Sequence, residues 1–271
     1  MAHTETAYAK INLLLHVLAR RADGYHEIET VFAFVDSGDK LTIEAADKDR
    51  VTTVGEFACE IGNPFANLVA KALNILPRSS GLHVTLEKNL PVAAGLGGGS
   101  ADAGAVFRFV GSGWGLPNGW QERAAKLGAD VPACVDSHTV YARGIGTKMI
   151  PIASSLEDTP ILLINPRVPL ATGPVFKAWD GVDRGLLPFS DARTMALNGR
   201  NDLTAPAISL CSVIGDVLEA LQQTDAWLTR MSGSGATCFA LYDTTDTRDA
   251  ASQFIRARYP EWWQMSGKLR E

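Results

Sequence analysis

The sequence predicts an α+β protein with two lobes, because strand and helix patterns are mixed along it without a regular βαβ order. The pattern of alternating elements begins again after about residue 150. The chain has 271 residues, 46% hydrophobic and 20% charged, an ordinary globular composition that suits one large domain or two of modest size. We expect one domain over residues 1–150 and a second over residues 151–271.

The first half carries five strand patterns and three helix patterns. Apolar residues alternate with others over residues 6–18, which predicts a strand. Further strands are expected at residues 28–34, 40–45 and 82–86, and an edge strand at residues 140–143. Helices are expected at residues 67–76, 100–110 and 120–127.

The second half repeats this mixture. A strand is expected at residues 161–164, a helix at 214–222 and another helix at 248–258. Two strands, at residues 227–231 and 236–241, flank a second glycine-rich loop. Residues 181–200 are polar and irregular, which predicts a surface loop.

The most informative segment is Pro91–Arg108. Glycines 95, 97, 98 and 99 fall within five residues, and Ser100 follows them at the start of a run of small, helix-forming residues. Glycine lets backbone N–H groups approach a ligand closely, and a helix that begins at Ser100 directs unpaired N–H groups and its positive end toward the loop. The pattern predicts a phosphate-binding site. The alternative is a flexible loop without a ligand, in which Ser100 only caps the helix that follows.

Two familiar phosphate loops are excluded. A Walker A loop has a lysine directly before its Ser or Thr, and no lysine precedes Ser100. A dinucleotide-binding fingerprint follows a buried parallel strand, whereas Pro91, which a central strand tolerates poorly, precedes these glycines. The loop is therefore of a third kind.

Pro91–Ala101 resembles the second motif of the GHMP kinases, the superfamily of galactokinase, homoserine kinase and mevalonate kinase. Further segments resemble one branch of it: residues 7–32, Leu127–Val135, Asn201–Leu203 and Met231–Leu241. The resemblance implies a two-lobed fold with the active site in the cleft between the lobes. It also implies an ATP-dependent kinase that phosphorylates the 2-hydroxyl of 4-(cytidine 5′-diphospho)-2-C-methyl-D-erythritol in non-mevalonate isoprenoid precursor biosynthesis.

Asp130 and Lys10 are the candidate catalytic residues. Asp130 lies in a small, apolar stretch before Pro132, where the pattern alone also suits a turn or N-cap aspartate. Lys10 interrupts an apolar strand, as a lysine that protects an edge strand also would. The resemblance implies that Asp130 accepts the hydroxyl proton. It implies that Lys10 lies beside Asp130, keeps it ionised and neutralises developing charge.

The resemblance also implies the residues that bind the two substrates. ATP is expected at Pro91, Ala93, Ala94, Gly95, Leu96, Gly97, Gly98, Gly99, Ser100 and Ala101, with Asn67 near the base unless it only caps its own helix. The acceptor is expected at Asn12, Tyr25, His26, Thr172, Phe176, Gly233 and Ser234.

Within that set, Tyr25 and Phe176 would stack on the cytosine ring and His26 would hydrogen-bond its edge. By pattern alone, Tyr25 is also typical of a half-buried aromatic residue and His26 of a solvated turn histidine. Asn12 shares a strand face with Lys10 and could bond the substrate hydroxyl or Asp130. The Gly233–Ser234 segment could equally be a simple hairpin turn.

Composition excludes several other classes of protein and ligand. The net charge of −5, with no Lys/Arg run longer than residues 20–21, argues against a nucleic-acid surface. Four widely spaced cysteines favour reduced thiols over a zinc site or a disulfide framework. No apolar stretch reaches 18 residues. Residues 11–19 are interrupted by Asn12 and His16, and the arginine pair at 20–21 follows them, whereas a signal peptide carries its basic charge before the apolar run. We expect a cytoplasmic monomer or weak homodimer whose partners are small molecules.

Magnesium is expected as well. Mg²⁺ is usually held by substrate phosphates and few protein groups, so we expect no dedicated protein metal site and Ser100 as the side chain that touches the ion.

Two other functions stay open on the sequence. One is a GHMP-type kinase with a different acceptor. The other is a nucleotide-binding module without catalysis, which is disfavoured because binding alone requires neither Lys10 nor Asp130.

Overall fold

The computed structural model describes residues 2–61 and 67–271, and its chain forms two compact units made of discontinuous segments. Unit 1 comprises Met1–Lys10, Ser37–Val92 and Gly97–Ser137, and unit 2 comprises Ile11–Asp36, Ala93–Leu96 and His138–Glu271. The two continuous domains that we expect to meet near residue 150 stay a prediction.

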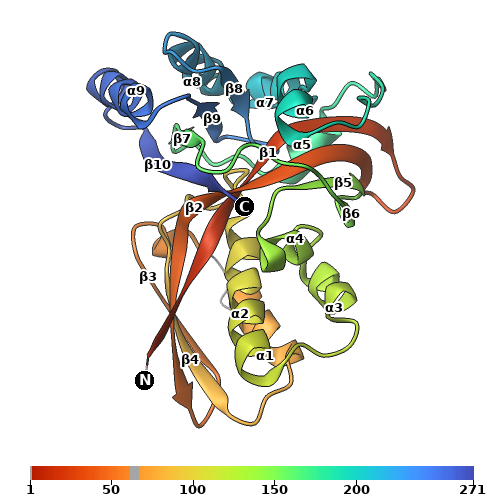
Figure 1. Ribbon diagram of the computed structural model, residues 1–271, viewed down its shortest axis with the longest axis vertical. Helices are drawn as coiled ribbons and strands as arrows, with labels where there is room; N and C mark the ends of the chain where they lie inside the picture. Colours follow the sequence, from red (N-terminus) through yellow and green to blue (C-terminus); the bar gives the residue numbers. More distant parts are fainter. Residues whose placement is uncertain (1, 62–66) are drawn as a thin grey trace. The chain divides into compact units, whose positions relative to one another are not determined.

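Unit 1 packs helices against one side of a small sheet (Figure 1). Its strands are the first part of β1 (His3–Arg20), the second part of β2 (His26–Ala46), β3 (Arg50–Val54) and β4 (Gly81–Glu87). Strand β4 lies between β3, which is parallel to it, and β2, which is antiparallel. A short 3₁₀ helix spans Ala58–Glu60, and the α-helices are α1 (Leu68–Ile75), α2 (Gly98–Trp114), α3 (Trp120–Leu127) and α4 (Val131–Asp136).

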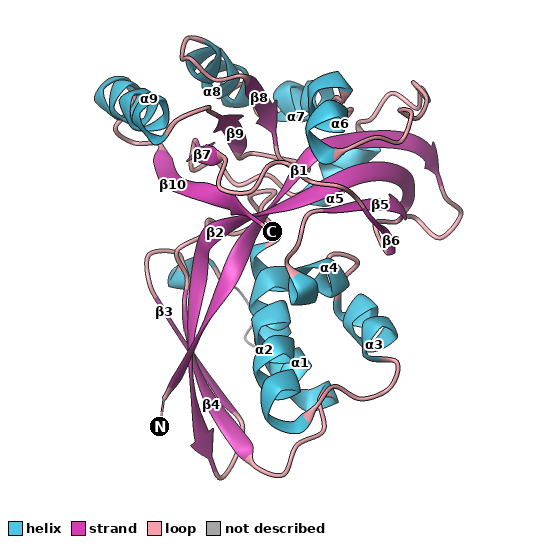
Figure 2. Cartoon of the chain, in the orientation of Figure 1, coloured by secondary structure: helices cyan, strands magenta, loops and turns pink. Residues whose placement is uncertain are grey.

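Unit 2 contains the antiparallel order β10-β7-β9-β8 and the hairpin of β5 and β6 (Figure 2). Its strands are β5 (Val140–Gly144), β6 (Lys148–Pro151), β7 (Pro160–Asn165), β8 (Leu228–Met231), β9 (Cys238–Leu241) and β10 (Trp263–Arg270). Its helices are α5 (Thr172–Lys177), α6 (Ala192–Asn198), α7 (Thr204–Leu210), α8 (Val213–Gln222) and α9 (Thr245–Arg258). The first part of β2 pairs with both β5 and β10.

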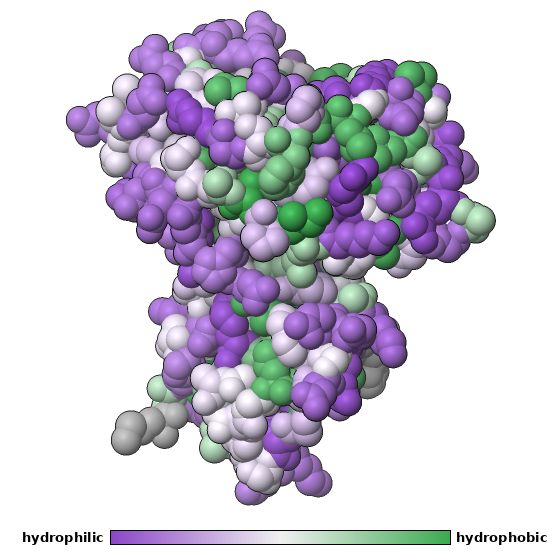
Figure 3. Space-filling view, turned by 45° about the vertical axis from the view of Figure 1, so that its right-hand side comes forward, coloured by the Kyte–Doolittle hydropathy of each residue, from purple (hydrophilic) through white to green (hydrophobic). Residues whose placement is uncertain are grey.

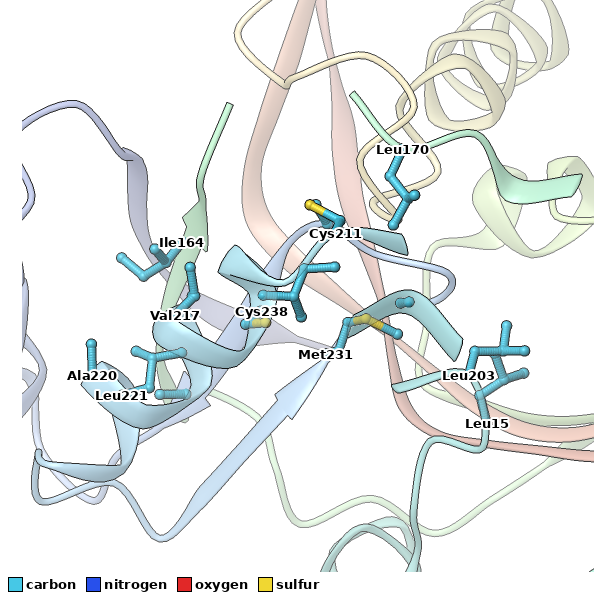
Figure 4. Close-up of a cluster of buried hydrophobic side chains, with 14 of the residues drawn as sticks. Leu15, Ile164, Leu170, Leu203, Cys211, Val217, Ala220, Leu221, Met231 and Cys238 are labelled. Carbon is cyan, nitrogen blue, oxygen red and sulfur yellow. The ribbon is translucent and has the colours of Figure 1, made fainter. Parts of the chain in front are cut away.

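The core of unit 2 forms where α8 meets the strands. Figure 4 shows Val217 and Leu221 of α8 grouped with Ile164 of β7 and Cys238 of β9. The buried residues of α8 recur every three to four positions, and those of each strand lie on one face. Their apolar side chains therefore meet and exclude water. This core holds β8 and β9, and therefore the turn between them, in place.

Three strand predictions need correction. Residues 28–34 and 40–45 belong to one strand, β2, because the polar residues between them continue the extended backbone instead of turning. Residues 140–143 do not form an edge strand, since β5 pairs with β2 on one side and β6 on the other. Strand β10 was not predicted from its short, mixed sequence.

One helix prediction and one loop prediction also need correction. Helix α2 begins at Gly98 and not at Ser100, because Gly97 takes a left-handed conformation (φ 62°) as the N-cap residue. The expected surface loop at 181–200 contains helix α6, whose start is capped by the Asp191 side chain accepting a hydrogen bond from Thr194 N. Helix α3 has the predicted bounds.

The surface has an ordinary distribution of side chains. On the face in Figure 3, hydrophobic patches lie among hydrophilic residues. Within residues 2–61 and 67–271, no helix combines the length and the apolar character needed to cross a membrane.

Candidate active site

Lys10 and Asp130 form an ion pair within unit 1. Lys10 of β1 is only 4% exposed, and its Nζ lies 3.1 Å from Oδ2 of Asp130. Asp130 occupies the N-cap position of α4 but makes no capping hydrogen bond, so its carboxylate is directed to the lysine. The Asp130 side chain stays one-third exposed, which leaves it accessible to a substrate hydroxyl.

The end of the glycine-rich segment lies at the same place. A Cβ on Gly97 would come within 3.0 Å of Lys10 Cε. A Cβ on Gly128, two residues before Asp130, would lie 3.6 Å from Ser100 Oγ. The first turn of α2, with its unpaired N–H groups and positive dipole end, is therefore gathered with the ammonium and the carboxylate.

Helix α2 also positions the helix that carries Asp130. A Cβ on Gly104 would lie 2.4 Å from the carbonyl oxygen of Cys134, so glycine allows α2 and α4 to touch through their backbones. Arg108 of α2 donates hydrogen bonds to Cys134 O (2.8 Å) and Ser137 Oγ (3.1 Å) at the end of α4. One helix thus holds both the phosphate-loop candidate and the catalytic-base candidate.

In unit 2, the first half of the glycine-rich segment contacts the loop between β8 and β9. Ser232 Oγ donates to Gly95 O (2.8 Å), and Thr237 N donates to Ala94 O (3.2 Å). Gly95 has φ +77°, and a Cβ there would come within 2.2 Å of Ser232 O. The loop is a hairpin turn, as the pattern alone also allowed, and it contacts the glycine-rich segment directly.

The acceptor candidates Asn12, Thr172, Gly233 and Ser234 are linked through this turn in unit 2. Asn12 donates to Thr30 Oγ1 (2.8 Å), and a Cβ on Gly233 would lie 3.4 Å from Asn12 Oδ1. Ser234 Oγ donates to Thr172 Oγ1 (3.0 Å) at the start of α5. The structure therefore brings these four residues into one connected set.

The candidate cytosine residues lie at the start of β2 and in α5. The rings of His26 and Phe176 are 4.9 Å apart and tilted by 43°. Tyr25 is 57% exposed, and the Asp23 carboxylate accepts a hydrogen bond from its backbone N–H. His26 Nε2 is buried without a hydrogen-bond partner among the described residues, and burial, with the nearby Arg20 charge, lowers the pKa of His26. A neutral imidazole with an unmatched ring nitrogen suits a base edge.

The remaining ATP candidates act through the backbone or through packing. The side chains of Pro91, Ala94, Leu96 and Ala101 are buried, whereas Ala93 and Gly99 are exposed. Asn67 is the N-cap of α1, because its Oδ1 accepts a hydrogen bond from Val69 N (2.9 Å). Its place near a nucleotide base stays a prediction.

Two neighbours of the site were missed from the sequence. Trp179 packs edge-on against His26 with 5.9 Å between ring centroids, and its place three residues after Phe176 was the available signal. Asn201 donates to the carbonyl oxygens of Met231 and Gly233, both at 2.8 Å. The sequence signal for Asn201 is the resemblance of Asn201–Leu203 to the family branch, which by itself indicates no role for the residue.

Metal-binding side chains are not clustered in the part of the chain that the structure describes: no group of three or more His, Cys, Asp or Glu residues there could hold an ion. The four cysteines are free thiols.

Sequence comparisons identify close relatives of this chain. The family models "GHMP kinases N terminal domain" and "GHMP kinases C terminal" match residues 65–138 and 192–261. A protein of Novosphingobium aromaticivorans named 4-diphosphocytidyl-2-C-methyl-D-erythritol kinase is 63% identical over 100% of this chain and 94% of its own length. A protein of the same name from Erythrobacter litoralis is 60% identical over 98% of this chain and 99% of its own length.

Solved structures share the fold. The crystal structure of a 4-(cytidine 5′-diphospho)-2C-methyl-D-erythritol kinase matches with a TM-score of 0.80 at 29% identity, covering 100% of both chains. A homoserine kinase from Cytophaga hutchinsonii matches with a TM-score of 0.68 at 14% identity over 99% of this chain and 95% of its own, which shows the fold alone.

Proposed function

Because this chain belongs to the GHMP kinases, within the family of its 4-diphosphocytidyl-2-C-methyl-D-erythritol kinase relatives, we propose that it transfers the γ-phosphoryl group of ATP to the 2-hydroxyl of 4-(cytidine 5′-diphospho)-2-C-methyl-D-erythritol. The observation that carries the proposal is the Lys10–Asp130 ion pair beside Gly97 and the start of α2.

Phosphoryl transfer requires in-line placement, neutralisation of charge on the γ-phosphoryl group and removal of the hydroxyl proton. The N–H groups at the start of α2 and the ammonium of Lys10 supply positive character next to Asp130. Asp130 is the acceptor of the hydroxyl proton, because its carboxylate is partly exposed and lies 3.1 Å from the buried ammonium of Lys10.

ATP is the co-substrate of GHMP kinases, and Gly95–Ser100 is the segment proposed to hold its phosphates. A Cβ on Gly95 would collide with Ser232 O, and a Cβ on Gly97 would lie 3.0 Å from Lys10 Cε. Glycine at these positions therefore leaves backbone N–H groups as the available donors. Mg²⁺ would take most of its ligands from the phosphates and from water, and the Ser100 hydroxyl is the candidate protein ligand. When bound, the ion neutralises phosphate charge.

For the acceptor, Tyr25 and Phe176 offer aromatic faces and His26 offers a ring nitrogen within unit 2. A flat apolar surface with one polar edge suits a pyrimidine base. Asn12 and the turn at Gly233–Ser234 supply amide, backbone and hydroxyl groups for the polar remainder of the acceptor.

An ADP-release assay tests the proposal. Purified protein is given ATP, Mg²⁺ and one of four acceptors: the cytidine-diphosphate-linked alcohol, mevalonate, homoserine or galactose. We expect kcat/KM for the first to exceed the others by at least about 100-fold. Preference for another acceptor would overturn the substrate, and ATP binding without turnover on any acceptor would leave a non-catalytic nucleotide-binding protein.

A further inference from the structure

Unit 1 contains a buried cluster of three charged residues outside the proposed reaction. Lys88, directly after β4, is 3% exposed and contacts the carboxylates of Asp39 and Asp102. Its Nζ lies 2.9 Å from Asp102 Oδ2. Asp39 and Asp102 are equally buried, at 0% and 3% exposed. We call these three residues the Lys88 cluster.

The Lys88 cluster joins the two ends of the glycine-rich segment. Lys88 lies just before this segment, and Asp102 lies within α2 just after it, so their ion pair closes residues 88–102 into a loop. Asp39 of β2 adds a third attachment, because its Oδ1 accepts hydrogen bonds from the backbone N–H groups of Asn89 (2.6 Å) and Leu90 (2.9 Å).

The cluster also lies directly beneath the loop. A Cβ on Gly98 would come within 3.3 Å of Lys88 Nζ and 3.5 Å of Asp39 Oδ2. The backbone of Gly98, which is proposed to face a phosphate, therefore packs directly against the ammonium of Lys88.

Stability alone explains this cluster poorly. Removing charges from water is costly, and buried ion pairs can often be replaced by apolar groups without loss of stability. The cluster holds one ammonium and two carboxylates, and Oδ1 of Asp102 has no hydrogen-bond partner among the described residues. Burial, reinforced by the charge of Asp39, raises the pKa of Asp102 to about 8 despite the opposing effect of Lys88. A protonated Asp102 brings the cluster to near neutrality, so it does not oppose an anion above it.

We propose that Lys88, held between Asp39 and Asp102, is a positioning residue that sets the conformation of Gly97–Gly99 for the polyphosphate of ATP. This role rests on the proposed function. It acts through the loop backbone, because both segments that flank the glycines are attached to the same ammonium and carboxylate groups. A loop fixed before binding loses less conformational freedom when it binds its ligand.

Two variants test this role by direct binding, independently of turnover. Lys88→Met removes the ammonium. Lys88→Met/Asp102→Leu also replaces the Asp102 carboxyl by an apolar side chain, so that Asp39, which keeps its hydrogen bonds from the N–H groups of Asn89 and Leu90, is the one carboxylate of the cluster left without its ammonium. Kd is measured by calorimetry for a non-hydrolysable ATP analogue and, separately, for CDP, whose proposed residues all lie in unit 2. We expect both variants to bind the ATP analogue at least about 10-fold more weakly, with Kd for CDP changed less than about 2-fold.

Asp102→Asn is the conservative control. It keeps an oxygen that can accept from Lys88, so its Kd for the ATP analogue should stay within about 3-fold of wild type. Wild-type affinity in both Lys88 variants would overturn the positioning role, as would parallel weakening of the ATP analogue and CDP or loss of the folded state in both. Failure of the unmodified protein to bind the ATP analogue would instead overturn the proposed function, and this role with it.

Discussion

The ammonium of Lys10 lies 3.1 Å from a carboxylate oxygen of Asp130, although the two residues are far apart in the chain. The lysine is almost fully buried, whereas the aspartate is partly exposed, so the cation is fixed and the carboxylate can reach a substrate. Packing of α2 against α4 through Gly104 holds this arrangement from one side. The relationship suits the proposed role of Asp130 as the proton acceptor.

Asp130→Asn should lower kcat by at least about 100-fold, because the amide cannot accept the hydroxyl proton. The affinity for ATP should change little, since the amide keeps a similar shape and a hydrogen-bond acceptor for Lys10. Steady-state kinetics with calorimetric ATP binding measures both. Asp136→Asn, at the other end of α4 and exposed, is the control and should keep wild-type kcat. An active Asp130→Asn enzyme would contradict the assignment of the base.

Tyr25→Ala should raise KM for the cytidine-diphosphate-linked acceptor by about 10-fold or more, because a lost stacking contact costs about 1–3 kcal/mol. KM for ATP should not change. Phe189→Ala is a matched control, since Phe189 is 58% exposed in the same unit and Tyr25 is 57% exposed. If the two variants have the same acceptor KM, the base is not bound at Tyr25.

Asn201→Ala should lower the free energy of unfolding by about 1–3 kcal/mol, because the carbonyl oxygens of Met231 and Gly233 lose their donor in a buried site. Chemical denaturation measures this change. Asn198→Ala removes a similar side chain from an exposed position and should change stability by less than about 0.5 kcal/mol. Equal effects of the two substitutions would show that the buried hydrogen bonds of Asn201 add nothing.

Gly95→Ala should destabilise the protein by about 2–4 kcal/mol, because φ is +77° and the new Cβ would collide with Ser232 O. Gly113→Ala is the comparison. It lies in the last turn of α2 with nothing within 4 Å of a Cβ, so it should stabilise by about 0.5–1 kcal/mol. Thermal unfolding of both variants measures whether each substitution raises or lowers the stability. A stabilised Gly95→Ala variant would refute the close contact.

The unfolding free energy should depend on pH through Asp102. Burial raises the pKa of this carboxyl from 3.8 to about 8, so between these values the folded protein holds a proton that the unfolded chain has released. The resulting stability is complete below about pH 4 and is lost as the pH rises through about 8. Relative to Asp102→Asn, the wild type should therefore lose stability from pH 5 to 8, by up to about 1.4 kcal/mol per pH unit.

Urea denaturation at several pH values measures this difference. Asp243→Asn, at a side chain that is 77% exposed, is the surface control. A difference between wild type and Asp102→Asn that stays constant with pH would contradict the raised pKa.

The candidate site residues could be proposed from local sequence, and their roles stay predictions. The glycines at 95 and 97–99 stand out without knowledge of distant contacts, whereas Asp130 was singled out by the resemblance of Leu127–Val135 to the family. Helix α3 was predicted with its observed bounds, since its start and end are marked by nearby glycines.

Other features were decided by partners distant in the chain. Strand β2 is continuous because β4, β5 and β10 pair along it, which overrides the turn-like residues in its middle. Gly97, not Ser100, is the N-cap of α2, although both residue types suit an N-cap. Trp179 and Asn201 acquire their roles only through contacts with His26 and the β8–β9 turn.

By itself, the sequence determined the kinds of chemical group present: glycine N–H groups, one ammonium, one carboxylate and an aromatic pair. The pairing of Lys10 with Asp130 was implied by the family resemblance alone, and the tertiary structure shows the two side chains in contact. Only the tertiary structure decided that Lys88 joins the two ends of the glycine-rich segment. The physical reason is that backbone preferences act over a few neighbouring residues, whereas ion pairing and burial depend on which distant segments pack together.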